Sequence, residues 1–155
     1  MIVFLRAGTV VAAIAFLLGC SAGWVRVNDV HNVHDVDGTL TKSELTEAII
    51  EGAQNAGWHA KDVGNDTVLA LYMVRVHSVQ VEIDVGDGFY VTRYKSSSGM
   101  KVFCSQRDRD FLRNMKVTGQ QECPGFGNPA YIHSAYETWM NSLNASIQQA
   151  ISMAQ

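Results

Sequence analysis

The chain has 155 residues, of which 47% are hydrophobic, and it contains only two prolines. This length allows one domain, and the composition excludes a disordered or collagen-like chain. With 12 basic and 15 acidic residues the formal net charge is −3, which gives no reason to expect nucleic acid as a partner.

The first residues have the pattern of an export signal. An apolar run from Val10 to Leu18 carries no charge. It is too short for a bilayer core, which takes about 20 residues to span, and it fits the apolar region of a secretory signal. The run ends in Leu17-Leu18-Gly19-Cys20, which resembles the lipobox of bacterial lipoprotein precursors. The resemblance implies that residues 1–19 are cleaved and that Cys20 is acylated, with palmitate among the expected chains; an ordinary cleaved signal or an uncleaved membrane helix is the alternative.

The residue after the cysteine bears on the location. Ser21 stands there rather than the aspartate that would retain the protein at the inner membrane. We therefore expect anchoring at the outer membrane, facing the periplasm, or at the outer face of the cell membrane in a bacterium with one membrane. Two or more acyl chains hold a protein firmly at a bilayer. Residues 20–40 are expected to form a lipid-anchored tether with a short edge strand at 25–30, and residues 41–155 a single domain.

Lipid at Cys20 leaves two cysteines, Cys104 and Cys123. Because an exported protein meets an oxidising compartment, we predict a disulfide between them that closes the loop 104–123. A two-cysteine metal site is the alternative, but no histidine or third cysteine lies between them to complete it.

The first predicted helix covers residues 42–56. Thr41-Lys42-Ser43-Glu44 has the pattern of a capping box, and Gly57 is a natural helix stop. Gly52 and Ala53 lie on the narrow apolar face, so we expect this helix to approach a neighbouring element closely.

The sequence from Trp58 to Ser96 changes to a period of two, which is typical of half-buried strands. The expected strands are residues 58–63, 67–75, 77–85 and 89–95. A tight reversal is expected near 75–78, although no glycine or proline marks it.

The second predicted helix covers residues 129–152. Asn128 and Pro129 suit a helix start, and aromatic and aliphatic residues recur at spacings of three and four from Ile132 to Ile151. The whole order predicts an α+β two-layer sandwich, in which a four-stranded antiparallel meander is flanked by an N-terminal and a C-terminal amphipathic helix.

A family resemblance covers roughly residues 41–99 and 129–152. The matching residues are Ala48-Ile49, Gly57-Trp58, Arg75, His77, Val79, Val81, Ile83, Tyr90, Tyr94, Ser97, Ile132-His133, Tyr136, Trp139 and Leu143. In these residues the chain is similar to a group of small uncharacterised bacterial lipoproteins of the outer-membrane type, which have a shorter connection in place of the loop 104–123. The resemblance implies fold and location, and it marks a candidate binding patch of polar and aromatic positions: Arg75, His77, Tyr90, Tyr94, Ser97 and His133.

Arginine and tyrosine in such a patch can hold an anionic group or a sugar. We expect Arg75, His77 and Tyr94 to share one face if the strands pair in sequence order. The alternative is structural, with Arg75 paired to a carboxylate and His133 in an exposed i,i+4 pair with Glu137.

The segment Asp35-Val36-Asp37-Gly38-Thr39-Leu40 resembles the first motif of haloacid-dehalogenase-type phosphatases. That resemblance implies that Asp35 attacks phosphorus, that Asp37 is the acid/base and that both hold Mg²⁺. The preceding residues are too polar for a buried parallel strand, and no alternating β–α units follow. His31, His34, Asp35 and Asp37 are weak candidates for a transition-metal site; a solvated linker is the alternative.

Charge is uneven along the chain. Residues 29–51 carry six acids and one base, and residues 93–116 carry seven bases and two acids. The two segments either attract each other in the fold or present a basic face to anionic lipid.

The sequence therefore leads to a non-enzymatic binding or assembly module of the cell envelope, with no cofactor, attached to the membrane by lipid and able to meet an envelope protein, an anionic lipid or a glycan. The alternative is a small metal-assisted, phosphatase-like hydrolase that uses Asp35 and Asp37; a structural spacer is a third reading. No Gly-x-Ser-x-Gly motif occurs, so covalent hydrolysis has no support.

Overall fold

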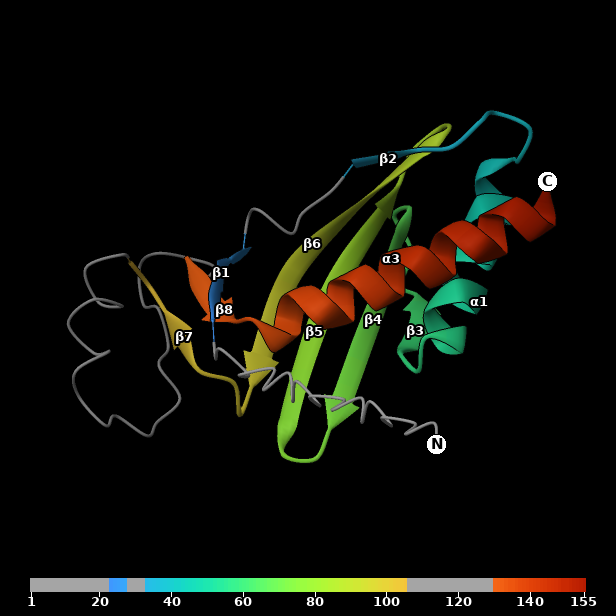
Figure 1. Cartoon of the computed structure of the whole chain (residues 1–155). Helices are drawn as coiled ribbons and strands as arrows, with labels where there is room; N and C mark the ends of the chain where they lie inside the picture. The colour runs from blue at the N-terminus through green and yellow to red at the C-terminus, as the bar shows by residue number, and fades with distance from the viewer. Residues whose placement is uncertain (1–22, 28–32, 106–129) are drawn as a thin grey trace, which may run out of the picture.

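The computed structural model describes residues 23–27, 33–105 and 130–155. Within these ranges it has two helices and eight strands in two antiparallel sheets, which confirms the α+β class (Figure 1). The predicted four-stranded meander is present but is not the whole sheet. It gains a fifth strand at one edge, and a separate three-stranded sheet lies beside it.

The main sheet contains the meander in sequence order. Its strands are β3 (His59–Asp62), β4 (Thr67–Val74), β5 (His77–Val85) and β6 (Phe89–Ser98), and β2 (Val33–Asp35) pairs with β6 to give the order β2-β6-β5-β4-β3. β5 has the predicted bounds. β6 runs three residues beyond the predicted end because a register shift opposite Gln80 and Val81 lets pairing continue to Ser98.

The reversal between β4 and β5 is a two-residue turn, Arg75-Val76, closed by the pair Val74 and His77. Arg75 has a φ of 56°, in the left-handed region that usually takes glycine. The position of the reversal is as predicted. The turn needs only two residues because Arg75 adopts a left-handed backbone conformation, which glycine usually supplies.

The small sheet joins distant parts of the chain. Its strands are β1 (Trp24–Arg26), β7 (Val102–Phe103) and β8 (Tyr131–His133), in the order β1-β8-β7. The described part of the predicted tether belongs to the fold, because β1 and β2 pair with β8 and β6 and Val27 is fully buried. The expected short edge strand at 25–30 overlaps β1, which lies at an edge of the small sheet. Backbone groups that a tether would leave in water are paired in sheets instead.

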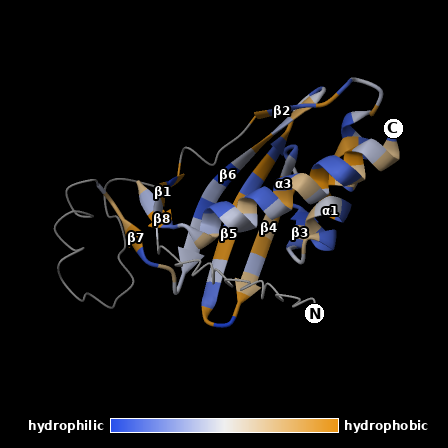
Figure 2. Cartoon of the chain, in the orientation of Figure 1, coloured by the Kyte–Doolittle hydropathy of each residue, from blue (hydrophilic) through white to orange (hydrophobic). Residues whose placement is uncertain are grey.

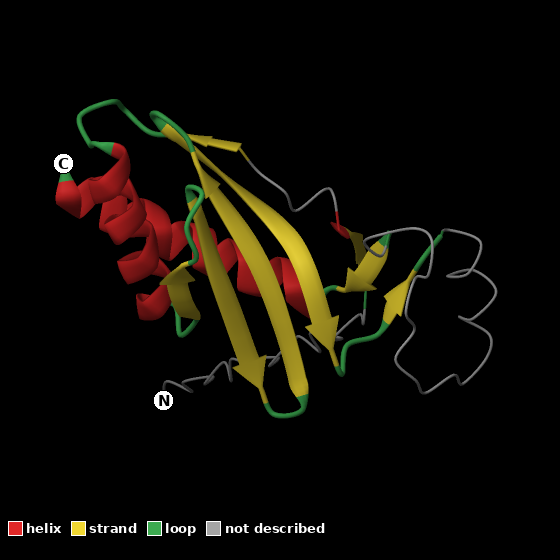
Figure 3. Ribbon diagram, turned by 180° about the vertical axis from the view of Figure 1, so that it is seen from behind, coloured by secondary structure: helices red, strands yellow, loops and turns green. Residues whose placement is uncertain are grey.

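Both helices cover one face of the main sheet, and Figure 3 shows the opposite face without a helix over it. α1 (Lys42–Asn55) starts with the predicted capping box: the Glu44 amide donates to Thr41 Oγ1 at 3.3 Å, and the Thr41 amide donates to a Glu44 carboxylate oxygen at 2.8 Å. α3 (Ala135–Ala154) begins later than predicted because residues 131–133 form β8. For that reason the expected helical i,i+4 relation between His133 and Glu137 does not exist.

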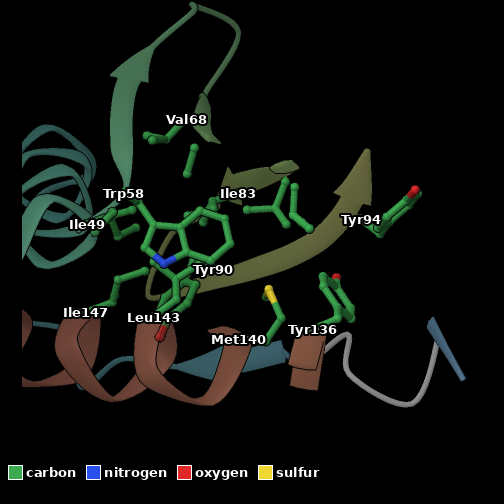
Figure 4. Close-up of a cluster of buried hydrophobic side chains, with 14 of the residues drawn as sticks. Ile49, Trp58, Val68, Ile83, Tyr90, Tyr94, Tyr136, Met140, Leu143 and Ile147 are labelled. Carbon is green, nitrogen blue, oxygen red and sulfur yellow. The ribbon is translucent and has the colours of Figure 1, made fainter. Parts of the chain in front are cut away.

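The core lies between the helices and the sheet (Figure 4). Ile49 of α1, Leu143 and Ile147 of α3, and Ile83 of β5 are fully buried. The helices approach as closely as the small residues predict, since a Cβ on Gly52 would lie 2.5 Å from the Cα of Ile147.

The face away from the helices is more polar, and Figure 2 shows apolar and polar residues alternating along the long strands. Glu82 pairs with Lys95 at 2.7 Å, and Asp84 pairs with Arg93. The bases of β6 thus pair with acids of β5 rather than with the acidic segment 29–51. No helix in the described ranges is long and apolar enough to cross a membrane.

Candidate functional site

The six residues of the predicted patch separate into three environments. Tyr90 and Tyr94 lie in the core, Arg75 lies in the β4–β5 turn, and Ser97 bonds to Tyr94. His77 and His133, which are far apart in the sequence, line one cavity. The six residues therefore do not form one surface, and the two histidines are the ones that the structure brings together.

The two tyrosines of β6 support the fold. Tyr90 is fully buried, accepts a hydrogen bond from the Gln148 amide at 3.0 Å, and burial raises the pKa of its hydroxyl to about 12. The Tyr94 hydroxyl lies 2.8 Å from Ser97 Oγ, and burial raises its pKa as well. Phenols held neutral in a core act as packing groups with one polar contact.

A cavity of about 360 Å³ lies where the two sheets meet the start of α3; we call it the junction cavity. Its lining is Trp24, His77, Gly99, Met100, Lys101, His133, Ala135 and Trp139. These residues come from β1, the start of β5, the β6–β7 connection, β8 and the first turns of α3. Ligand sites in proteins are typically concave, largely apolar spaces of this size with a few polar groups.

The two imidazoles of the cavity present different faces. His77 Nδ1 lies 2.7 Å from the carbonyl oxygen of Gly99, and since a carbonyl only accepts, this Nδ1 carries the hydrogen. His133 Nδ1 accepts a hydrogen bond from the Ala135 amide at 3.2 Å. In the neutral rings, Nε2 of His77 is therefore an acceptor and Nε2 of His133 is a donor. A hydroxyl group can pair with either nitrogen, because it both donates and accepts.

Two half-buried indoles complete the wall. Trp24 packs edge-on against Phe103, with ring centroids 4.4 Å apart, and lies 6.0 Å from the ring of His133. Trp139 packs against Tyr72, with centroids 5.2 Å apart. Sequence reasoning placed Trp24 in the tether and Trp139 in a helix stripe, so it missed both as lining residues. The one signal in the sequence that could have pointed to them was that Trp24 and Trp139 are large aromatic residues, which are common in binding sites.

Asp35 and Asp37 line a separate hollow of about 150 Å³ together with Gln148, Ser152 and Gln155. Gln155 donates its side-chain amide to the carbonyl oxygen of Asp37 at 3.0 Å. β2 is antiparallel to β6, so Asp35 does not end a buried parallel strand.

The described residues contain no group of three or more His, Cys, Asp and Glu side chains placed to hold a metal. His34 stacks on Tyr90, and His31 lies outside the described residues. Within the described residues, His34, Asp35 and Asp37 therefore do not form a metal site.

The predictions at the cysteines concern other parts of the chain. Cys104 follows β7, whereas Cys20 and Cys123 lie outside the described residues. Lipidation of Cys20 and the disulfide between Cys104 and Cys123 therefore stay predictions.

A wider hollow of about 570 Å³ lies along the edge strand β3, where Lys61, Leu69, Leu71 and Gln80 contribute to its lining. The junction cavity differs from it in gathering two imidazoles and two indoles from separate elements.

Compared with protein-family models, with curated proteins and with solved structures, the chain has no match.

Proposed function

We propose that this protein is a lipid-anchored cell-envelope protein, held at the periplasmic face of the outer membrane through Cys20, and that its domain is a binding module that uses the junction cavity. The observation that carries the proposal is that Trp24, which follows Cys20 by four residues in the sequence, lines the cavity. The carbonyl oxygen of Gly23 accepts a hydrogen bond from the Ser134 amide at 3.0 Å, and Trp24 lines the cavity. Three residues span at most about 11 Å, so lipid at Cys20 would keep the cavity close to the bilayer.

The lining favours a small ligand with an apolar body and an acidic or hydroxyl group. Trp24, Trp139 and Met100 supply the apolar wall, and Lys101 supplies a positive charge. Among the described residues the lining contains no carboxylate, so none of them adds a negative charge that would repel an anion. The acceptor on His77 and the donor on His133 would orient the polar end of the ligand.

The anchor is tested on the chain produced in its host with labelled palmitate. We expect label and membrane association in the wild type, and neither the label nor cleavage before residue 20 in Cys20→Ser. Recovery of native protein in the aqueous fraction with residues 1–19 still attached would refute the proposal.

The binding site is tested with 1-anilinonaphthalene-8-sulfonate, an apolar anion that fluoresces when it leaves water. The mature chain without Cys20 should bind one equivalent. Ala135→Trp, which fills the cavity, should weaken binding at least about tenfold, equivalent to about 1.4 kcal/mol. His133→Ala, which removes an imidazole from the lining, should also weaken binding. The matched control is His59→Ala, at an exposed histidine of β3, which should bind normally. Equal affinity in all variants would contradict the proposed site.

The second candidate function is a metal-assisted hydrolase, which rests on Asp35 and Asp37 sharing one hollow. It requires turnover of p-nitrophenyl phosphate with Mg²⁺, and loss of that turnover in Asp35→Asn. Absence of Mg²⁺-dependent turnover in the wild type removes this candidate.

A further inference from the structure

The β4–β5 hairpin ends in an apolar tip, residues 73–76 (Figure 1). His77, the residue after this tip, contributes to the lining of the junction cavity. Met73 is 57% exposed and Val76 is 79% exposed, with Arg75 between them. We propose that this tip is a second membrane contact that docks on an anionic lipid surface and fixes the orientation of the cavity. The inference rests on the proposed anchor at Cys20 and adds to it a defined face toward the bilayer.

The tip is held rigidly by the residues behind it. A Cβ on Gly99 would lie 2.2 Å from the carbonyl oxygen of Val76, so only glycine lets the β6–β7 connection pack against the turn. The hydrogen bond from His77 Nδ1 to the Gly99 carbonyl ties the same two segments together. The turn that carries the exposed apolar side chains is therefore held in place by its contacts with the β6–β7 connection.

The residue at the turn is unusual for its conformation. Arg75 adopts a φ of 56°, where glycine would avoid steric strain. Such strain is retained most often where a side chain has a function. In the sequence this cation stands between two exposed apolar residues, Met73 and Val76. Cations next to exposed apolar residues are typical of segments that enter the headgroup region of a membrane.

The charges around this end are mostly positive. Within the described residues, the β4–β5 turn and the β6–β7 connection that packs against it carry Arg75 and Lys101 and no acid. The first turn of α3, which contributes to the lining of the junction cavity, adds Glu137. Two cations and one acid favour a surface of anionic phosphates.

The size of the tip favours lipid over a protein partner. A stable protein interface buries about 1,200 Å² or more in total, which two exposed side chains cannot supply. Trp24 and His77 line the same cavity, so the start of the described chain and the residue next to the tip share one hollow. Lipid at Cys20 would hold the bilayer within reach of that hollow, and a small apolar tip is sufficient for a second contact with it.

The test uses the full lipidated chain reconstituted into vesicles of phosphatidylcholine, with or without phosphatidylglycerol. An environment-sensitive nitrobenzoxadiazole label is attached at Val76→Cys. The matched control is Val63→Cys, another exposed valine, in the turn at the opposite end of the sheet. Lipids brominated near the headgroup should quench the label at position 76 and leave the label at position 63 bright. Arg75→Gln should reduce the ratio of docked to undocked tips about fivefold in anionic vesicles, the factor expected for one cation at such a surface.

The outcomes separate the two proposals. Protein that is retained by the vesicles, with equal quenching at both positions, overturns the tip contact and leaves the anchor standing. Quenching at position 76 that ignores phosphatidylglycerol and Arg75→Gln overturns the anionic surface as the partner. Protein that washes off the vesicles overturns the anchor and the tip together.

Discussion

The imidazole of His34 stacks on the ring of Tyr90, with centroids 4.6 Å apart and ring planes 21° apart. The two residues face each other across the pairing of β2 and β6. His34 Nε2 is buried, and within the described ranges it has no hydrogen-bond partner. Burial lowers the pKa of His34 below its ordinary value of 6.5. The stacking of the neutral His34 imidazole on Tyr90 thus helps to hold the edge strand β2 against β6.

This arrangement predicts that acidification weakens the edge strand. Because the folded-state pKa of His34 lies below the unfolded value, its stabilising contribution is complete above about pH 6.5 and is lost as the pH falls toward the folded pKa. In hydrogen exchange, the amides of residues 33–35 should lose protection in this window. His34→Phe, which keeps the stacking and cannot be protonated, should keep the protection. His59→Phe, at an exposed site, should behave like the wild type; loss of protection in His34→Phe as well would contradict the prediction.

The close approach of the helices predicts a sharp effect at Gly52. A methyl group there would meet the backbone of Ile147 and Ser146 at 2.5–2.9 Å, and backbone yields less readily than the end of a side chain. Gly52→Ala should lower the free energy of unfolding by about 1–3 kcal/mol, measured by chemical denaturation. Gly38→Ala is the control, since no atom of the described residues lies within 4 Å of its added methyl group. Equal stability of the two variants would contradict the helix–helix contact.

Local signals explain which elements could be predicted. The capping box at Thr41 and Glu44 places the start of α1, and the alternation over residues 77–85 places β5, because both patterns depend on near neighbours. The small residues of α1 correctly predict a close neighbour. The pattern could not say that this neighbour is α3, since nothing local connects them.

The errors come from long-range pairing. β1, β2 and β8 have three residues each, too few for a periodic pattern, and each is a strand only because a distant segment pairs with it. The helical spacing that begins at Ile132 therefore extended the second predicted helix into β8. The site follows the same rule: His77 and His133 were singled out, but their meeting with Trp24 depends on the small sheet.

The capping box predicts a measurable loss at the start of α1. Burial plays little part there, and the hydrogen bonds from Thr41 lower the pKa of Glu44. Thr41→Ala should reduce the free energy of unfolding by about 1 kcal/mol. Since the Glu44 pKa is lowered in the fold, the carboxylate's contribution is present above its unfolded pKa and is lost as the pH falls through the folded value. Melting curves of the wild type and Glu44→Gln should therefore converge in acid; a constant difference at all pH values would contradict the box.

The buried hydroxyl of Tyr136 predicts no loss of stability when it is removed. Tyr136 is fully buried, and within the described ranges its hydroxyl has no hydrogen-bond partner. Tyr136→Phe should leave stability unchanged or raise it by about 1 kcal/mol, because no bond is lost and a buried polar atom disappears. Tyr94→Phe is the matched control, since it removes the contact with Ser97 and should lower stability. Destabilisation by Tyr136→Phe equal to that of Tyr94→Phe would show that the hydroxyl is satisfied.

The strained turn separates stability from function at Arg75. Arg75→Gly removes the cost of a left-handed arginine, about 1–2 kcal/mol, and offsets part of that gain with the extra freedom of glycine in the unfolded chain, about 0.5–1 kcal/mol. The variant should therefore be slightly more stable than the wild type in chemical denaturation. Arg75→Ala keeps the strain and should not gain. If the side chain serves the membrane contact, Arg75→Gly and Arg75→Ala should lose vesicle docking equally, although only the first is stabilised. If Arg75→Gly docked normally and only Arg75→Ala lost docking, docking would depend on the stability of the turn and not on the charge. Arg75 would then serve the fold alone.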